Sequence, residues 1–257
     1  MDNLPAELLW EITKDLPKKD LIQVFSASSR LRSLFWHRIS DEIQIDLNNV
    51  PDWVPFVTNG YVENELPDFD LFPELKHLTF GRDFNQPVDN LPLNLRSLTF
   101  GYNFNQPVEH LPSSLQSLTF GDRFNQPVEH LPLNLRSLTF GWCFNQPVEH
   151  LPSGLQSLTF GSDFNQPVEH LPLNLRSLIF GRCFNQPVDH LPPNLQSLTF
   201  GYYFDQSVDN LPSSLQSLTF GDRFNQPVDN LPSGLQSLTF LGKYNQPINN
   251  LPISLLS

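Results

Sequence analysis

The sequence predicts a mixed fold, in which a short α-helical segment at the N-terminus precedes a β-solenoid with one short parallel strand per 20-residue coil. The phrase LPLNLRSLTFGYNFNQPVEH at 91–110 returns every 20 residues between 71 and 250, giving nine units and a partial one at 251–257. Residues 4–40 lack this repeat and instead carry apolar residues at helical spacing. A repeat of fixed length is typical of coils that bury their apolar faces only by stacking on each other.

Each unit predicts a strand, a turn and an irregular return path. Leu98 and Phe100 are separated by one residue, so a strand around 97–100 turns both side chains to one face. Gly101 predicts the turn, and the prolines at 92 and 107 exclude a regular helix on the return. The Asn105 column is expected to bond the backbone of neighbouring coils. Six apolar columns should form the core: Leu91, Leu95, Leu98, Phe100, Phe104 and Val108, with their equivalents.

The pattern LPxxLxxLxFGxxFNQPV resembles the FNIP repeat, a relative of leucine-rich repeats. The resemblance covers residues 71–257, and the pattern recurs in register nine times. It implies a leucine-rich-repeat-like (LRR-like) solenoid for this part of the chain.

The N-terminal segment, residues 1–45, predicts three short helices. Leu8, Leu9 and Ile12 lie at helical spacing after Pro5, which suits a first helical position. A second helix is expected within 18–26, and a third is expected to begin at Ser28 or Ser29. So small a helical unit buries little surface alone, so it needs something to pack against.

The motif LPxELLxxI…LPxxDLxxV…SSRLRSL in this segment resembles the F-box. That family binds Skp1 and links a recognition domain to a cullin-RING ubiquitin ligase. Leu31 stands where the family often has Trp, which should weaken the contact with Skp1. A helical cap for the solenoid is the alternative interpretation. The resemblance implies this partner-binding set: Leu4, Pro5, Leu8, Ile12, Leu16, Leu21 and Val24.

Residues 46–70 are predicted to link the helical segment to the solenoid at 71–257 and to cap its first edge. The alternation at 42–47 indicates a strand that seeds the sheet. The stretch 50–70, which holds aromatic residues among prolines, is expected to be irregular cover over the first coil.

Composition and charge exclude several kinds of partner. The net charge is −12, with 13 acidic and 6 basic residues in 1–70 and 14 acidic and 9 basic residues in 71–257. Neither part is basic, so no nucleic acid partner is expected.

No apolar run is long enough to span a membrane, and no signal peptide is evident. Cys143 and Cys183 lie two coils apart, too far for a disulfide, so free thiols and a cytoplasmic or nuclear location are expected.

The pair of residues after each turn glycine varies most between coils and is the candidate site for a protein substrate. We call these pairs, from 82–83 to 242–243, the variable rim. Tyr, Trp and Arg are the residue types that anchor protein interfaces. The alternative is drift in loops that nothing binds. The predicted substrate-binding residues are Arg82, Tyr102, Arg123, Trp142, Arg182, Tyr202, Tyr203 and Arg223.

Two repeated columns suggest other functions that we do not favour. The histidines at 110, 130, 150, 170 and 190 follow acidic residues, but a straight column does not converge into a tetrahedral metal site. The Ser-Leu-Thr column resembles ice-binding solenoids, but its neighbours vary. Catalysis needs different groups that converge at one place, whereas every candidate here is repeated. We therefore expect no enzyme activity, no metal and no cofactor.

Together these features predict an adaptor of a Skp1–cullin–F-box (SCF) type ubiquitin ligase. The F-box-like segment would bind a Skp1-like protein within a cullin complex, and the solenoid would bind a protein substrate. The alternative is a non-catalytic scaffold, or a decoy for the ligase. Families that join these two parts are abundant in amoebae and their large DNA viruses, so the resemblance also implies redirection of a host ligase.

Overall fold

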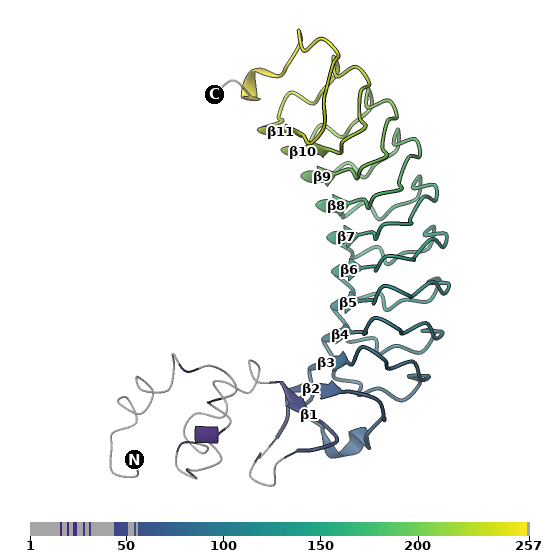
Figure 1. Ribbon diagram of the computed structural model, residues 1–257, viewed down its shortest axis with the longest axis vertical. Coiled ribbons are helices and arrows are strands. Elements are labelled where there is room, and N and C mark those ends of the chain that lie inside the picture. The colour runs from purple at the N-terminus through teal and green to yellow at the C-terminus, as the bar shows by residue number, and fades with distance from the viewer. Residues whose placement is uncertain are drawn as a thin grey trace.

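The computed structural model describes residues 44–50, 54 and 56–255, and the single positions 16, 20, 23, 24, 28 and 31. The described chain is a curved stack of coils whose strands form one parallel sheet in the order β1 to β11 (Figure 1). The strands are β1 Ile45–Asp46, β2 Asn59–Val62, β3 His77–Phe80, β4 Ser97–Thr99, β5 Ser117–Thr119, β6 Ser137–Thr139, β7 Ser157–Thr159, β8 Ser177–Ile179, β9 Ser197–Thr199, β10 Ser217–Phe220 and β11 Ser237–Phe240. Two 3-10 helices, η1 Phe69–Leu71 and η2 Ile253–Leu255, lie in the coils before β3 and after β11.

Each repeat strand pairs with the equivalent residues of the next coil, so the register follows the 20-residue period. Ser97 lies beside Ser117 and Leu98 beside Leu118, and the same alignment continues to β11. The ladder extends before the strands, because the backbone N–H groups of Gln116 and Ser117 both donate to the Arg96 carbonyl. One short parallel strand per coil, as the repeat predicts, is confirmed.

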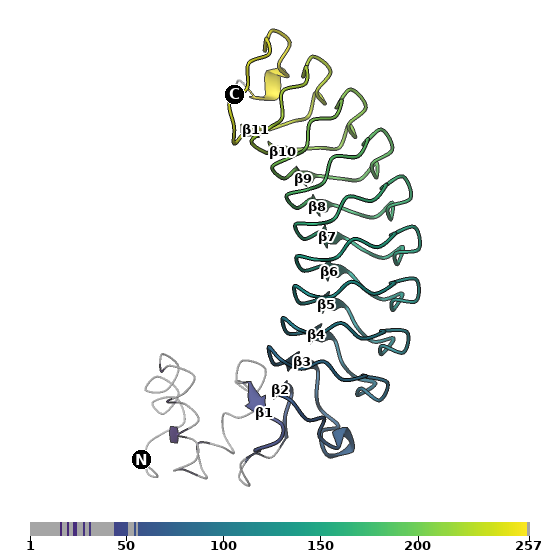
Figure 2. The same ribbon diagram turned by 45° about the vertical axis from the view of Figure 1, so that its right-hand side comes forward.

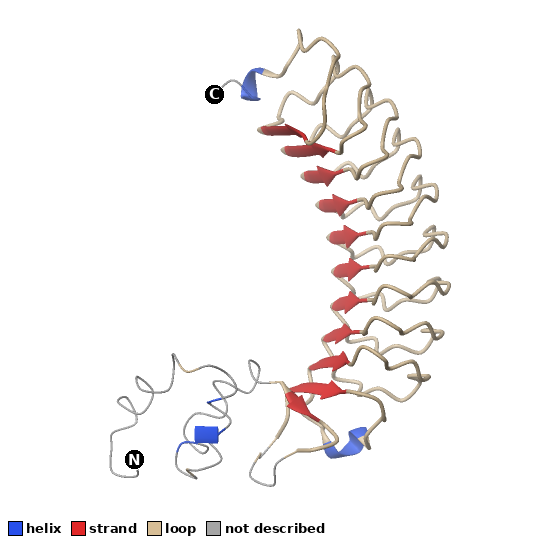
Figure 3. Ribbon diagram, in the orientation of Figure 1, coloured by secondary structure: helices blue, strands red, loops and turns tan. Residues whose placement is uncertain are grey.

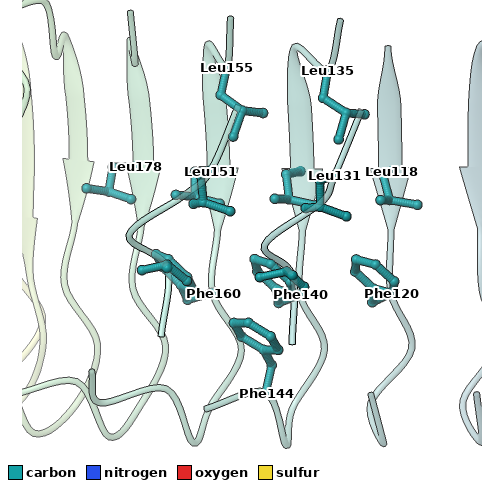
Figure 4. Packing of buried hydrophobic residues seen from close by; sticks show 14 of the residues in the cluster. Leu118, Phe120, Leu131, Leu135, Phe140, Phe144, Leu151, Leu155, Phe160 and Leu178 are labelled. Atoms are coloured by element: carbon teal, nitrogen blue, oxygen red, sulfur yellow. The ribbon is translucent and has the colours of Figure 1, made fainter. Parts of the chain in front are cut away.

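The core consists of the six predicted apolar columns, which are buried throughout the inner coils. Figure 4 shows leucines and phenylalanines of successive coils lying in line. Within a coil the rings of Phe100 and Phe104 stack at 3.7 Å between centroids. Each buried side chain of this size contributes about 1.5–3 kcal/mol, so the stack is stabilised mainly by these columns. At the two ends of the solenoid the residues of these columns are more exposed to solvent: Leu71 is 70% exposed, and Ile248 is 55% exposed.

The arc of the molecule follows from the size of the core side chains. Strands in a sheet lie about 4.8 Å apart, but the Phe100 and Phe120 rings are 5.6 Å apart, and the Phe104 and Phe124 rings are 6.1 Å apart. Because each coil is therefore thicker away from the sheet, stacking bends the solenoid with the strands on its concave side. Figures 2 and 3 show this bend, with the strands inside and the return loops outside.

The glycine column at the end of each strand is required by contact between coils. A Cβ atom on Gly141 would lie 2.2 Å from the carbonyl oxygen of Gly121, and the other inner coils repeat this contact. No described glycine has a positive φ. The glycine predicted to make the turn is therefore needed because two backbones approach closely there.

The Asn105 column holds the coils together, as predicted from the sequence. The side-chain oxygen of Asn105 accepts a hydrogen bond from the backbone N–H of Asn125 at 2.9 Å. The Gln126 amide donates to the Asn105 carbonyl at 3.2 Å. The members of this column are half-buried or exposed. It therefore lies at the edge of the core, on the return path.

The first edge of the sheet was predicted from the sequence only in part. The predicted strand at 42–47 is present as β1 at Ile45–Asp46, and it pairs with β2 at the edge of the sheet. The prediction of irregular structure over 50–70 is wrong at Asn59–Val62, which forms β2 between β1 and β3. Gly60 packs against Leu47 there, since a Cβ would lie 2.8 Å from the Leu47 side chain, which would have to shift.

The predicted F-box surface falls largely outside the described residues. Leu4, Pro5, Leu8, Ile12 and Leu21 lie outside them. Leu16 and Val24 are partly buried and pack against the hydrophobic core cluster, and Leu31 is 1% exposed. Among the described residues of this segment, Asp20, Gln23, Val24 and Leu31 are helical. The F-box and its Skp1-binding surface are not shown and stay predictions.

Candidate protein-binding rim

The variable rim lies directly after the strands, at the turn that leads to the return path. A backbone ladder fixes its spacing: the N–H of Asn103 donates to the Arg82 carbonyl at 2.9 Å, and that of Arg123 to the Tyr102 carbonyl at 3.0 Å. The same bonds join Asp163 to Trp142 and Arg223 to Tyr202. The rim is therefore a rigid row whose side chains are ordered by the coil spacing.

Aromatic and arginine side chains gather in two clusters on this rim. In the first, the guanidinium carbons of Arg82 and Arg123 lie 5.0 and 5.6 Å from the Tyr102 ring centroid. These distances are within the range of cation–π attraction. The first cluster spans three successive coils, which place Tyr102 between the two arginines.

The second cluster repeats this arrangement five coils further along. Arg182 lies 5.3 Å from the Tyr202 ring, and Arg223 lies 4.8 Å from the Tyr203 ring. The two tyrosine rings meet edge to face, with 4.9 Å between their centroids. Tyr202 stays 37% exposed, so this packing leaves ring surface free for a partner.

Trp142 lies in sequence between the two clusters and is 53% exposed. Its backbone N–H is 3.3 Å from a carboxylate oxygen of Asp122, a contact that helps to hold this part of the rim. Exposed tryptophan on a rigid backbone loses little conformational entropy on binding, which is why such residues anchor interfaces.

Acidic residues alternate with the arginines and make the rim electrostatically mixed.

Burial, and then the carboxylates of Asp163 and Asp122, raise the pKa of the Cys143 thiol. Cys143 is therefore protonated at neutral pH and a poor nucleophile. Both cysteines are free. In the part of the chain that the structure describes, no cluster of His, Cys, Asp and Glu could hold a metal ion.

All eight predicted rim residues lie on this one rim, but their role in binding stays a prediction. The sequence indicated their position, because a residue two places after each strand must follow the sheet edge. The pairing of arginines with tyrosines was missed, although the 20-residue register places Arg82, Tyr102 and Arg123 in neighbouring coils.

A second feature that the sequence reasoning missed lies on the opposite flank, at the beginning of the strands. Two adjoining grooves of about 560 and 640 Å³ run there and share Asn134 and Arg136. The signal was the 40-residue alternation between Leu-Asn-Leu-Arg and Ser-Ser-Leu-Gln or Ser-Gly-Leu-Gln before the strands of the five coils from 91 to 190.

Comparison with known proteins identifies the repeat. A family described as "FNIP Repeat" matches the chain at 62–103, 87–123, 104–143, 124–163, 144–183, 184–223 and 207–240. A solved structure titled "The crystal structure of CroV588 a novel circular LRR protein structure" is 41% identical, with a TM-score of 0.72. The match covers 82% of this chain and 34% of that one, so this chain spans about a third of that protein's length. No curated protein matches the chain. Among the described residues, none of the helices has the length and apolarity to cross a membrane.

Proposed function

The chain belongs to the FNIP repeat family, whose coils here form an LRR-like solenoid, and we propose that it is a substrate-recognition adaptor of an SCF-type ubiquitin ligase. The solenoid binds a protein substrate, and the N-terminal segment binds a Skp1-like protein. The adaptor carries no chemistry of its own and acts by bringing two proteins together in the cytoplasm or nucleus.

The variable rim is the observation that supports substrate binding. It combines exposed Trp142 with two arginine–tyrosine clusters on a backbone fixed by hydrogen bonds. Buried aromatic and arginine side chains contribute most of the energy in protein interfaces. The link to the ligase rests instead on the resemblance of residues 4–34 to the F-box.

Co-purification of the full chain with a Skp1-type protein tests the ligase link. The Leu4→Ala/Leu8→Ala/Ile12→Ala variant should lose the Skp1-type protein, because it removes three of the apolar contacts. The matched control carries Tyr102→Ala/Trp142→Ala/Tyr202→Ala/Tyr203→Ala, which alters the rim and should retain the Skp1-type protein.

If the unmodified chain fails to bind a Skp1-type protein, the ligase role is wrong. The chain is then a non-catalytic scaffold whose N-terminal segment caps the solenoid. If the N-terminal variant binds as well as the unmodified chain, the Skp1 contact lies elsewhere and the assigned residues are wrong.

A further inference from the structure

The flank opposite the variable rim carries a regular row of cations. Arg96, Arg136 and Arg176 occupy the last position of Leu-Asn-Leu-Arg in every second coil, and Lys76 precedes them in the first coil. The coils between them carry Gln116 and Gln156 at the same position. This row, with Leu93, Leu133 and Leu173, is called the basic flank below.

The backbone fixes the spacing of this row. The N–H of Gln116 donates to the Arg96 carbonyl, and the N–H of Arg136 donates to the Gln116 carbonyl, each at 2.8 Å. One coil therefore advances the row by the strand spacing of about 4.8 Å, and two coils by about 9.6 Å. Arg96 and Arg176 are consequently about 19 Å apart along the flank.

The cations line a continuous polar groove. Lys76, Arg96 and Arg136 line its first part, and Arg136 and Arg176 line its second part. Side-chain amides tie the groove together, since Asn134 donates to the Ser113 carbonyl at 2.8 Å and Asn174 to the Ser153 carbonyl at 2.9 Å. These bonds hold the two asparagine side chains in place along the groove.

The charges of this groove are free to bind a ligand. Within the described residues, neither the three arginines nor Lys76 has an ion-pair partner, and Glu74 is the single acidic side chain lining the groove. The chain as a whole carries a net charge of −12. A row of unpaired cations on so acidic a protein selects for negative groups at these few points and disfavours long polyanions.

Exposed leucines accompany the cations at the same period. Leu93 and Leu133 are 82% and 78% exposed, and Leu173 is 66% exposed. The intervening coils have Ser113 and Ser153 there. A leucine and an arginine of the same coil therefore recur together about every 9.6 Å along the flank.

We propose that the basic flank binds an acidic, proline-rich peptide in the polyproline II conformation, with a carboxylate at every third residue. Polyproline II has three residues per turn and rises 3.1 Å per residue, so such carboxylates lie on one face about 9.3 Å apart. Six residues span about 19 Å, the distance from Arg96 to Arg176. The proline rings pack against the exposed leucines.

Other conformations fit this spacing less well. On a β-strand, residues three apart point to opposite faces. On an α-helix, carboxylates seven residues apart are separated by about 10.5 Å, which is longer than the spacing of about 9.6 Å between the arginines. A third carboxylate would therefore lie about 2 Å beyond the third arginine. No aromatic side chain lines the groove in the described chain, so it lacks the stacking platform of single-stranded nucleic acid sites.

Titration of the full chain with a fluorescent peptide of repeated Glu-Pro-Pro triplets tests this proposal. The Arg96→Gln/Arg136→Gln/Arg176→Gln variant inserts the residue that alternate coils already carry there, so it should fold normally. We expect it to bind at least tenfold more weakly, and we expect binding to the unmodified chain to weaken as salt rises. The control Arg123→Gln/Arg182→Gln/Arg223→Gln removes the same charge from the variable rim and should bind normally.

Two further probes distinguish a spaced site from simple charge attraction. A peptide of repeated Gln-Pro-Pro triplets should not bind, and a peptide of the same composition with its glutamates adjacent should bind at least tenfold more weakly. Equal binding of the adjacent-glutamate peptide, tighter binding of single-stranded oligothymidine, or equal binding by both arginine variants would overturn the proposal. Peptide binding at the basic flank requires neither Skp1 nor the variable rim, which is altered only in the control variant, so the proposal can fail independently of the proposed function.

Discussion

Asn145 acts as a hydrogen-bond acceptor between coils. Its side-chain oxygen lies 2.9 Å from the backbone nitrogen of Asn165 and 3.2 Å from the side-chain nitrogen of Gln166, and both of these groups donate. One copy of the column has aspartate, and Asp205 accepts from the Asn225 backbone in the same way. The column therefore requires an oxygen at this position, and it tolerates a charge.

Substitutions at Asn145 should separate these two requirements. Asn145→Ala removes the acceptor and should lower the free energy of unfolding by about 1 kcal/mol, the net value of one hydrogen bond. Asn145→Asp keeps both contacts and should change stability less. Denaturant unfolding of both variants measures the difference, and equal losses would mean that the acceptor is not what matters.

Tyr61 links β2 to the residues that follow it and makes the first edge sensitive to high pH. Its hydroxyl donates to the Glu63 carboxylate. This bond, followed by burial and the nearby charges of Glu63 and Asp46, raises the pKa of Tyr61 to about 12. In the unfolded chain a tyrosine pKa is about 10. Because the folded-state value is raised, the contact stabilises the fold below pH 10, and its contribution is lost as pH rises through about 12.

The near-ultraviolet absorbance difference between the native chain and Tyr61→Phe isolates this titration from the other tyrosines. Its midpoint should lie near the raised pKa of about 12. A midpoint near 10, the value for an unperturbed tyrosine, would show that the contact with Glu63 does not hold in solution.

At the scale of one coil, the glycine between strand and rim sets how closely coils stack. A Cβ on residue 141 would lie 2.2 Å from the Gly121 carbonyl oxygen, a distance that forces the two backbones apart. The rim pair follows directly, so the same contact positions Trp142. Strand, glycine and rim thus form one unit, in which packing determines where the exposed side chains lie.

Gly141→Ala should therefore destabilise the solenoid by about 1–3 kcal/mol or more, as overpacking does in protein cores. Gly234→Ser is the matched control: a Cβ there has its nearest neighbour at 3.7 Å, and Ser114 and Ser214 occupy the same column in other coils. Thermal unfolding followed by circular dichroism compares the two variants. Equal melting temperatures would show that the coils can separate without cost.

The sequence predicts the coil well because its signals are local and repeated. Leu98 and Phe100 lie on either side of Thr99, and this pattern is repeated in nine units. One pairing register between the strands places the equivalents of Leu98 and Phe100 in the core of every coil. β2 at Asn59–Val62 lacks this advantage, since it belongs to no repeat and contains Gly60. Its strand conformation depends on pairing with β1 and β3, which the local sequence does not encode.

The site could be predicted in position but only partly in chemistry. The variable rim follows from counting residues after each strand. The contacts of Arg82 and Arg123 with Tyr102 depend on side-chain conformations, which a column alignment does not give. The grooves of the basic flank depend on which side chains remain unpaired. The sequence does not show this pairing, and the structure does.

At the scale of the whole molecule, the wedge shape of the coils bends the stack into an arc. The two flanks of the sheet carry different chemistry. The rim has mixed charge and aromatic residues, whereas the opposite flank carries arginines and leucines at every second coil between 91 and 190. Since the two rows lie at opposite ends of the same strands, one solenoid presents two separate surfaces. The 40-residue period allows two coils to be gained or lost without changing the spacing of the basic flank.

The most direct test of the adaptor account is to find which surface touches the substrate. A photo-cross-linking amino acid is placed at Trp142 on the rim, or at the exposed His150 on the return path of the same coil, in the full chain inside cells. The account predicts that position 142 captures a protein whose ubiquitination is lost in the Leu4→Ala/Leu8→Ala/Ile12→Ala variant, and that position 150 does not. Capture of that protein from position 150 alone would contradict the assignment of the rim as the substrate-binding surface.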